Sequence, residues 1–109
     1  LRELTNLEEL HVKSTQITDA GFVHLKELKS LTRLELTFTQ ISDAGLVHLG
    51  GLTNLTRLDL NYTKITDQGL VHLKRLTSLK NLFLPRRVTA AAVTELKKAL
   101  PNCEIHRYP

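Results

Sequence analysis

The sequence contains few of the residues that mark secreted or membrane proteins. Of its 109 residues, one is cysteine, three are proline, and none is methionine or tryptophan. The single thiol, Cys103, can form no disulfide within the chain, whereas small secreted domains usually depend on several. No apolar run approaches the roughly 18 residues that span a bilayer, and the first ten residues lack a signal-peptide pattern. We therefore expect a cytoplasmic location and no membrane association.

Charge is distributed unevenly along the chain. Residues 1–60 contain six Lys/Arg and eight Asp/Glu, a net charge of −2, whereas residues 61–109 contain nine and three, a net charge of +6. A basic half is compatible with an acidic partner, with nucleic acid or with a solvated helix surface. Because only 5% of the residues are aromatic, few side chains are available for base stacking, and we do not expect nucleic acid binding.

The most informative feature of the sequence is an internal repeat. The stretch TQITDAGFVHL at 15–25 returns as TQISDAGLVHL at 39–49 and as TKITDQGLVHL at 63–73, a spacing of 24 residues. A period of this length is typical of a solenoid, in which each repeat forms one coil and packs on its neighbours.

The repeat defines the expected domain organisation. We expect one domain over residues 1–109, with repeats that start near residues 7, 31, 55 and 79 and a terminal partial repeat or cap over 100–109. In that last repeat, Leu100, Cys103 and Ile105 match the leucine positions of the others. The chain begins at Leu1 and not at methionine, with the pattern already in phase. We therefore expect it to be a fragment of a longer protein.

Each repeat changes its hydrophobic period midway. Leu10, His11 and Val12 alternate between apolar and polar, as do the residues 24, 48 and 72 positions later, which is typical of a half-buried strand. The apolar residues that follow, such as Phe22 and Leu25, recur every three positions and indicate the buried stripe of a helix. The sequence therefore predicts a strand, a turn and a helix in each coil.

Small and polar residues recur between the predicted strand and helix. Hydroxyl residues are placed as helix N-caps and are followed by an aspartate that either sits in the first helical turn or serves as the cap itself. A recurrent glycine predicts that a neighbouring coil lies too close for a Cβ, and a recurrent threonine predicts a hydroxyl that pairs with buried backbone groups. In this order, the four sets are Thr18, Ser42 and Thr66; Asp19, Asp43 and Asp67; Gly21, Gly45 and Gly69; and Thr15, Thr39 and Thr63.

The template L-x-x-L-x-L-x-x-T-x-I-T-D-x-G-L resembles the leucine-rich repeat superfamily over residues 4–106. It is most similar to the cysteine-containing, ribonuclease-inhibitor-like subclass, found in F-box substrate receptors, and to the 24-residue repeats of large bacterial proteins. Threonine at 15, 39 and 63 departs from the F-box type and favours the bacterial type. The resemblance implies an α/β fold, a right-handed solenoid shaped as an arc with a parallel β-sheet on its concave face and α-helices on its convex face. It also implies protein binding.

The strand residues that alternate with the leucines define the candidate site. They differ from one repeat to the next, as expected for a recognition surface on a repeated scaffold. We predict that a protein partner of unknown identity contacts the following concave-face residues: Arg33, Glu35, Phe38, Arg57, Asp59, Tyr62, Phe83 and Arg86. Aromatic and arginine side chains are frequent hot spots. Two structural alternatives stay open, since the aromatic rings at 38 and 62 could cover a loop edge and the two strand arginines could pair with the neighbouring acids.

No group of residues indicates an enzyme, a metal site or a cofactor. His24, His48 and His72 occupy the same helical position in successive coils, too far apart to bind one ion. Cys103 and His106 are expected on opposite sides of the terminal strand. We therefore predict a non-enzymatic protein–protein interaction module without a metal or cofactor. The alternative is a structural spacer or sensor segment of a larger multidomain protein, such as a kinase or an F-box-like substrate receptor.

Overall fold

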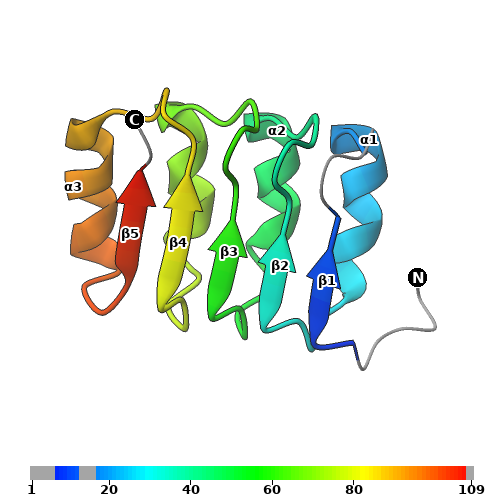
Figure 1. The fold of residues 1–109 in the computed structure, drawn as a ribbon. Helices are drawn as coiled ribbons and strands as arrows, with labels where there is room; N and C mark the ends of the chain where they lie inside the picture. The colour runs from blue at the N-terminus through cyan, green and yellow to red at the C-terminus, as the bar shows by residue number, and fades with distance from the viewer. Residues whose placement is uncertain (1–6, 13–16, 108–109) are drawn as a thin grey trace.

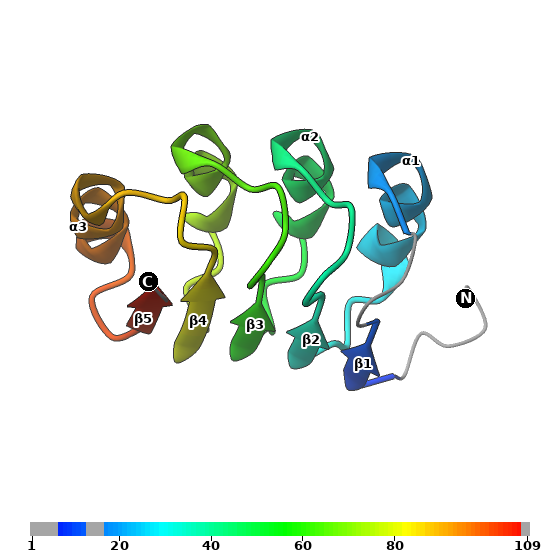
Figure 2. The ribbon, with the colours of Figure 1, turned by 45° about the horizontal axis from the view of Figure 1, so that its top comes forward.

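The computed structural model describes residues 7–12 and 17–107. Within these residues, five parallel strands form one open sheet in chain order. The strands are β1 (Glu9–His11), β2 (Arg33–Glu35), β3 (Arg57–Asp59), β4 (Asn81–Leu84) and β5 (Glu104–Arg107). The helical segments all lie on one side of the sheet (Figure 1) and form a second layer (Figure 2). Each strand reaches the next by a right-handed crossover through that layer, which confirms the predicted α/β solenoid.

The helical layer is built from short α and 3₁₀ segments. In chain order they are α1 (Asp19–Phe22), η2 (Val23–Glu27), α2 (Asp43–Leu46), η3 (Val47–Leu49), η4 (Asp67–Leu73) and α3 (Ala90–Ala99). The predicted places are confirmed, but much of this layer is 3₁₀ and not α. The three-residue apolar spacing explains the difference, because a 3₁₀-helix has three residues per turn and aligns residues i and i+3. Phe22, Leu25 and Leu28, spaced in this way, are all buried.

The leucines of successive coils form one stacked interior. The strand register aligns Leu10, Leu34, Leu58 and Leu82 on neighbouring strands, and the last three have exposed fractions of 0%. The apolar stripes of the helical layer close this interior from the other side. At the N-terminal end, Leu7 and Leu10 are only partly buried. Each coil therefore buries its apolar side against its neighbours, as expected for a solenoid.

Two of the recurrent threonines close the bends that follow β2 and β3. Thr39 Oγ1 donates to Leu36 O at 2.8 Å, and Thr63 Oγ1 donates to Leu60 O at 2.7 Å. Both threonines are buried, so their hydroxyls pair with backbone carbonyls in the interior. The predicted role is confirmed at these two positions, and Thr15 lies outside the described residues.

The recurrent aspartates link neighbouring coils. Asp43 Oδ1 accepts a hydrogen bond from the Thr66 N–H at 2.8 Å, and Asp43 Oδ2 accepts one from the Thr66 hydroxyl. The same two bonds join Asp19 to Ser42 and Asp67 to Thr89. Each carboxylate therefore fixes the start of the helical layer in the next coil, 22 or 23 residues along the chain.

The predicted cap hydrogen bonds do not form at Thr18, Ser42 and Thr66, although all three stand at the N-cap position. A hydroxyl cap accepts from the N–H two or three residues further on. At Ser42 and Thr66 the third N–H, that of Gly45 and Gly69, donates instead to the backbone carbonyl of the cap residue at 3.0 Å. The tight first turn therefore occupies the donor that the hydroxyl would have used.

Two recurrent glycines make room for the linking carboxylates. A Cβ at Gly45 would collide with Asp19 Oδ1, and a Cβ at Gly69 would lie 2.8 Å from Asp43 Cγ. The predicted close approach of a neighbouring coil is confirmed at these positions. At Gly21 the nearest atom belongs to the same coil, at 3.4 Å, so the prediction is wrong there.

The last strand departs from the predicted register. Ile105, and not Cys103, pairs with Leu82, so the assignment of Cys103 to that leucine position is wrong. The preceding coil contains α3, an α-helix of ten residues. From Leu82 to Ile105 this coil takes 23 residues, one fewer than the 24 from Leu58 to Leu82, whereas the predicted pairing of Cys103 would have left it 21. Cys103 is nevertheless buried, as predicted.

Candidate protein-binding surface

Polar and aromatic side chains alternate with the buried leucines and line the side of the sheet away from the helices, which we call the sheet face. The register arranges them in two rows. One row contains Glu9, Arg33, Arg57, Asn81 and Glu104, and the other contains His11, Glu35, Asp59, Phe83 and His106. Neighbours in a row are about 4.8 Å apart. The sheet face therefore presents acidic, basic and aromatic groups within contact distance of one another.

A stack of three side chains covers the C-terminal half of the sheet face. The guanidinium carbon of Arg57 lies 4.5 Å from the centre of the Phe83 ring. The Phe83 ring stacks on His106 with 4.7 Å between centroids and 15° between planes. A cation over an aromatic ring contributes about 0.5–1 kcal/mol at an exposed site. Arg57 and Phe83 were predicted site residues, and the stack joins them across β3, β4 and β5.

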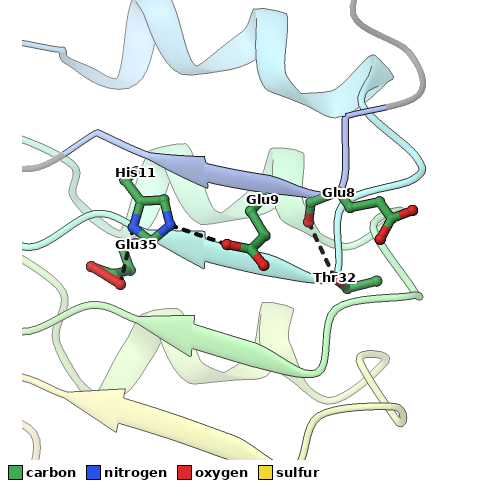
Figure 3. Close-up of polar contacts among 5 residues, drawn as sticks. All are labelled: Glu8, Glu9, His11, Thr32 and Glu35. Carbon is green, nitrogen blue, oxygen red and sulfur yellow. Dashed lines mark hydrogen bonds and ion pairs between the residues drawn. The ribbon is translucent and has the colours of Figure 1, made fainter.

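The acidic residues of the N-terminal half lie against a histidine. His11 Nδ1 is 3.0 Å from Glu35 Oε1, and His11 Nε2 is 3.5 Å from Glu9 Oε1 (Figure 3). Glu35 therefore pairs with His11 and not with Arg33, which was the structural alternative from the sequence. The register explains this choice, because His11 and Glu35 are direct neighbours in one row while Arg33 lies in the other row.

Asp59 takes a backbone partner within its own coil. Its Oδ1 accepts a hydrogen bond from Asn61 N at 3.0 Å. Arg57, which was the alternative partner of Asp59 from the sequence, stacks on Phe83 instead. In place of the alternative Arg57–Asp59 ion pair, the sheet face therefore has a turn hydrogen bond and a cation–π contact.

Phe38 and Tyr62 lie in the bends that follow β2 and β3. Their exposed fractions are 51% and 61%, and their rings stack with 4.4 Å between centroids and 2° between planes. Both residues have left-handed backbone conformations, with φ of 64° and 59°. This region costs a residue with a side chain about 1–3 kcal/mol. The fold thus holds two exposed aromatic rings in a conformation that such residues rarely adopt.

A cavity of about 420 Å³ opens beside this aromatic pair. Its lining includes Phe38, Tyr62, Arg86 and Lys64. Neither of these two cations takes part in an ion pair within the described part of the chain. The lining therefore combines aromatic and cationic groups, a combination that suits a segment with both apolar and acidic groups.

The structure brings the predicted site residues together in two groups. Arg33, Glu35, Arg57, Asp59 and Phe83 lie on the sheet face, and Phe38, Tyr62 and Arg86 line the cavity at its edge. Sequence reasoning missed His106 and Lys64 as neighbours of these groups. His106 depended on the register of β5, whereas the position of Lys64, two residues after Tyr62, was a signal that it could share the edge.

The histidines considered as metal ligands do not converge. His24 is exposed, and His48 and His72 are half-buried on successive coils. Among residues 7–12 and 17–107, no group of three or more His, Cys, Asp or Glu is placed to hold a metal ion. In the same ranges, no helix has the length and apolar character required to cross a membrane.

Cys103 is a poor nucleophile in this structure. Burial raises the pKa of its thiol, an effect that nearby Lys97 opposes and Glu104 reinforces. His106, the base considered for it, stacks on Phe83 at the sheet face. Because the thiolate is the reactive form, a buried thiol with a raised pKa is not suited to nucleophilic chemistry.

Stacked strand–helix coils around a leucine interior define an α/β solenoid of the repeat-protein class. The family model described as leucine-rich repeat matches residues 3–26, 27–50 and 51–74, which is more than half of the chain. The chain belongs to the leucine-rich repeat family, whose solenoids present extended surfaces for binding. No curated protein matches it.

Solved structures of bacterial proteins share the fold. Internalin C2 from Listeria monocytogenes is 29% identical, with a TM-score of 0.77 over 95% of this chain and 42% of its own. A leucine-rich repeat protein from Leptospira interrogans is 26% identical, with a TM-score of 0.70 over 91% of this chain and 25% of its own. The chain thus spans less than half the length of either protein.

Proposed function

We propose that this protein binds another protein through its sheet face and the adjoining cavity, and catalyses no reaction. The observation that carries the proposal is the stacked pair of Phe38 and Tyr62, two exposed aromatic rings with positive φ. Strained backbone conformations cluster at functional sites, where the surrounding structure imposes them. Aromatic and arginine side chains also supply much of the binding energy at protein interfaces.

The proposed contact surface extends over the two groups described above. Its members are Arg33, Glu35, Phe38, Arg57, Asp59, Tyr62, Phe83 and Arg86, with His106 added because it stacks on Phe83. A stable interface takes about 20–30 residues on each side, and the two rows with the cavity lining approach that size. The variation of these positions around constant leucines supports a role in recognition.

The test compares two double variants of the whole chain. Phe38→Ser with Tyr62→Ser removes the exposed aromatic pair, while Val47→Ser with Val71→Ser removes two side chains of similar exposure, 53% and 54%, from the helical layer. Each variant serves as bait in a crosslinking pull-down from cells of the source organism, and the captured proteins are purified and measured by calorimetry. We expect binding at least about tenfold weaker for the aromatic variant, because hot-spot residues each contribute more than about 1 kcal/mol. The valine variant should bind as the wild type does.

The same comparison decides between binding and the spacer or sensor alternative. If every captured protein binds the two variants and the wild type equally well, the exposed aromatic pair is not part of a binding surface and the spacer is favoured. Turnover of any substrate that is abolished by Cys103→Ala or His106→Ala would contradict the non-enzymatic part of the proposal.

We further propose that the protein acts in the cytoplasm. The lone thiol, buried at Cys103, needs no oxidising compartment. Fractionation of the source cells with an antibody against the chain should recover it with cytoplasmic markers. Recovery with extracellular or envelope markers would contradict this location.

A further inference from the structure

We propose that Arg33, Arg57 and Lys80 form a pocket for a side-chain carboxylate of the protein partner. The inference rests on the proposed function and names the chemistry of one contact. The pocket lies on the sheet face where β2, β3 and β4 begin, and its volume is about 240 Å³. Thr56 and Asn81 complete its lining.

The lining offers hydrogen-bond donors and no carboxylate. Arg33 and Arg57 are direct register partners on β2 and β3, and Asn81 is the next residue of that row on β4. Guanidinium, ammonium and amide groups are all donors. Like charges directly opposite each other on neighbouring strands are destabilising. An anion between the two guanidinium groups would replace that repulsion by charge-assisted hydrogen bonds, for which carboxylate geometry is well suited.

Three acids of the sheet face have partners other than these arginines. Glu35 and Glu9 both lie against His11 (Figure 3). Asp59 accepts a hydrogen bond from the backbone of Asn61. Within the described ranges, the three cations of the pocket take part in no ion pair. The cationic pocket is therefore open to an anion from outside the chain.

Arg57 is held in place before any ligand arrives. Its guanidinium lies over the Phe83 ring, and its side chain is half-buried. A guanidinium that stacks by its flat face keeps its N–H edge for a carboxylate. A side chain that is already ordered loses less conformational entropy on binding. The stack thus favours the carboxylate pocket and connects it to the aromatic part of the sheet face.

The test uses the whole chain with a hexaglutamate peptide as the probe, and with hexaglutamine and inorganic phosphate for comparison at constant ionic strength. Two variants lose the same charge: Arg33→Gln with Arg57→Gln in the pocket, and Lys26→Gln with Lys29→Gln at exposed positions in η2 and in the turn after it. Arginine Nε–H resonances report on the pocket directly. We expect hexaglutamate, and not hexaglutamine, to shift the signals of Arg33 and Arg57 with saturation.

The pocket variant should weaken hexaglutamate binding by about tenfold or more, because hydrogen bonds to charged groups contribute about 1.5–3 kcal/mol. The lysine variant should weaken it far less. Equal weakening by both variants, or equal binding of hexaglutamine, would overturn the pocket. Saturation by phosphate with the affinity of the peptide would overturn the partner carboxylate as the ligand, because a free anion would then suffice.

One comparison distinguishes failure of the carboxylate pocket from failure of the proposed protein-binding function. Once a partner is captured, its binding is measured to the Phe38→Ser/Tyr62→Ser variant and to the Arg33→Gln/Arg57→Gln variant. Weak binding to both supports both proposals. Weak binding to the aromatic variant alone would support the proposed protein-binding function and contradict the carboxylate pocket. Wild-type affinity for both variants would contradict both proposals.

Discussion

The two faces of the sheet differ in how much their residues vary from coil to coil. The inner face repeats a single residue, with Leu34, Leu58 and Leu82 all at 0% exposure. The outer face, between the same residues, changes from coil to coil and carries acidic, basic and aromatic side chains in the same two rows. Because adjacent strand residues point to opposite faces, one set of positions specifies the fold while the other is free to differ between coils. The difference teaches that residue parity separates the positions that stabilise the fold from the positions proposed for recognition.

The largest effect should follow from a change on the inner face. Leu58→Ala leaves a cavity in a fully buried stack and should lower the free energy of unfolding by about 2–5 kcal/mol. Asp59→Ala, on the other face of the same strand, is half-exposed and should cost about 1 kcal/mol for its turn hydrogen bond. Urea unfolding measures both. Equal urea midpoints for the two variants would contradict the claim that the inner face contributes more to stability than the outer face.

A smaller loss should follow from breaking a link between coils. Asp43→Ala removes the acceptor of the Thr66 N–H and hydroxyl, and should lower the free energy of unfolding by about 1–3 kcal/mol. Urea unfolding gives the change, and hydrogen exchange should show faster exchange of the Thr66 amide. The control is Glu95→Ala, whose ion pair with Lys98 is exposed and should contribute about 0–1 kcal/mol. A loss no greater than that of the control would show that the carboxylate link is not stabilising.

The outer face should lose binding without losing stability. Phe38→Asn with Tyr62→Asn removes a ring stack of about 0.5–1.5 kcal/mol but relieves two positive-φ positions at about 1–2 kcal/mol each, since asparagine tolerates that conformation. Urea unfolding should therefore show stability equal to or above that of the wild type, while a captured partner binds more weakly. A loss of stability greater than about 2 kcal/mol would show that the aromatic pair is part of the core.

The smallest effect should appear at alkaline pH. Because burial raises the pKa of the Cys103 thiol above its ordinary value of 9.0, the folded state binds its proton more tightly than the unfolded state. The contribution of this thiol to stability is therefore fully present below about pH 8.5 and is lost as pH rises through the folded pKa. Cys103→Val removes this dependence. The difference in urea midpoint between the two proteins should shift in favour of the variant between about pH 7 and about pH 10, and a constant difference would contradict the raised pKa.

Much of the fold was predictable because identical residues recur at a constant spacing and alternate along each strand. The leucine interior, the buried threonines and the close approach at Gly45 and Gly69 all follow from that pattern. The kind of helix did not follow, since apolar residues three apart suit both α and 3₁₀ geometry. The links from Asp43 and its equivalents were missed because their partners lie 22 or 23 residues away, beyond the reach of local capping rules.

The candidate site was predictable as a set of positions and not as a set of contacts. Strand parity correctly placed Arg57, Asp59 and Phe83 on one face. It did not predict which of several possible partners each side chain contacts. Arg57 stacks on the ring of Phe83 and does not pair with the adjacent carboxylate of Asp59. The positive φ of Phe38 and Tyr62 also could not be predicted from the sequence, because bulky residues rarely adopt that backbone conformation.

Thiol labelling of single cysteines, in a Cys103→Val background and with a captured partner, tests the separation of the two faces most directly. Cysteines replace Arg57, Leu58, Asp59 and Val71 one at a time. We expect rapid labelling at 57, 59 and 71 in the free protein, protection at 58, and slower labelling at 57 and 59 alone when the partner is bound. Partner-induced protection at 71, with 57 and 59 unchanged, would place the binding surface on the helical layer and contradict this assignment.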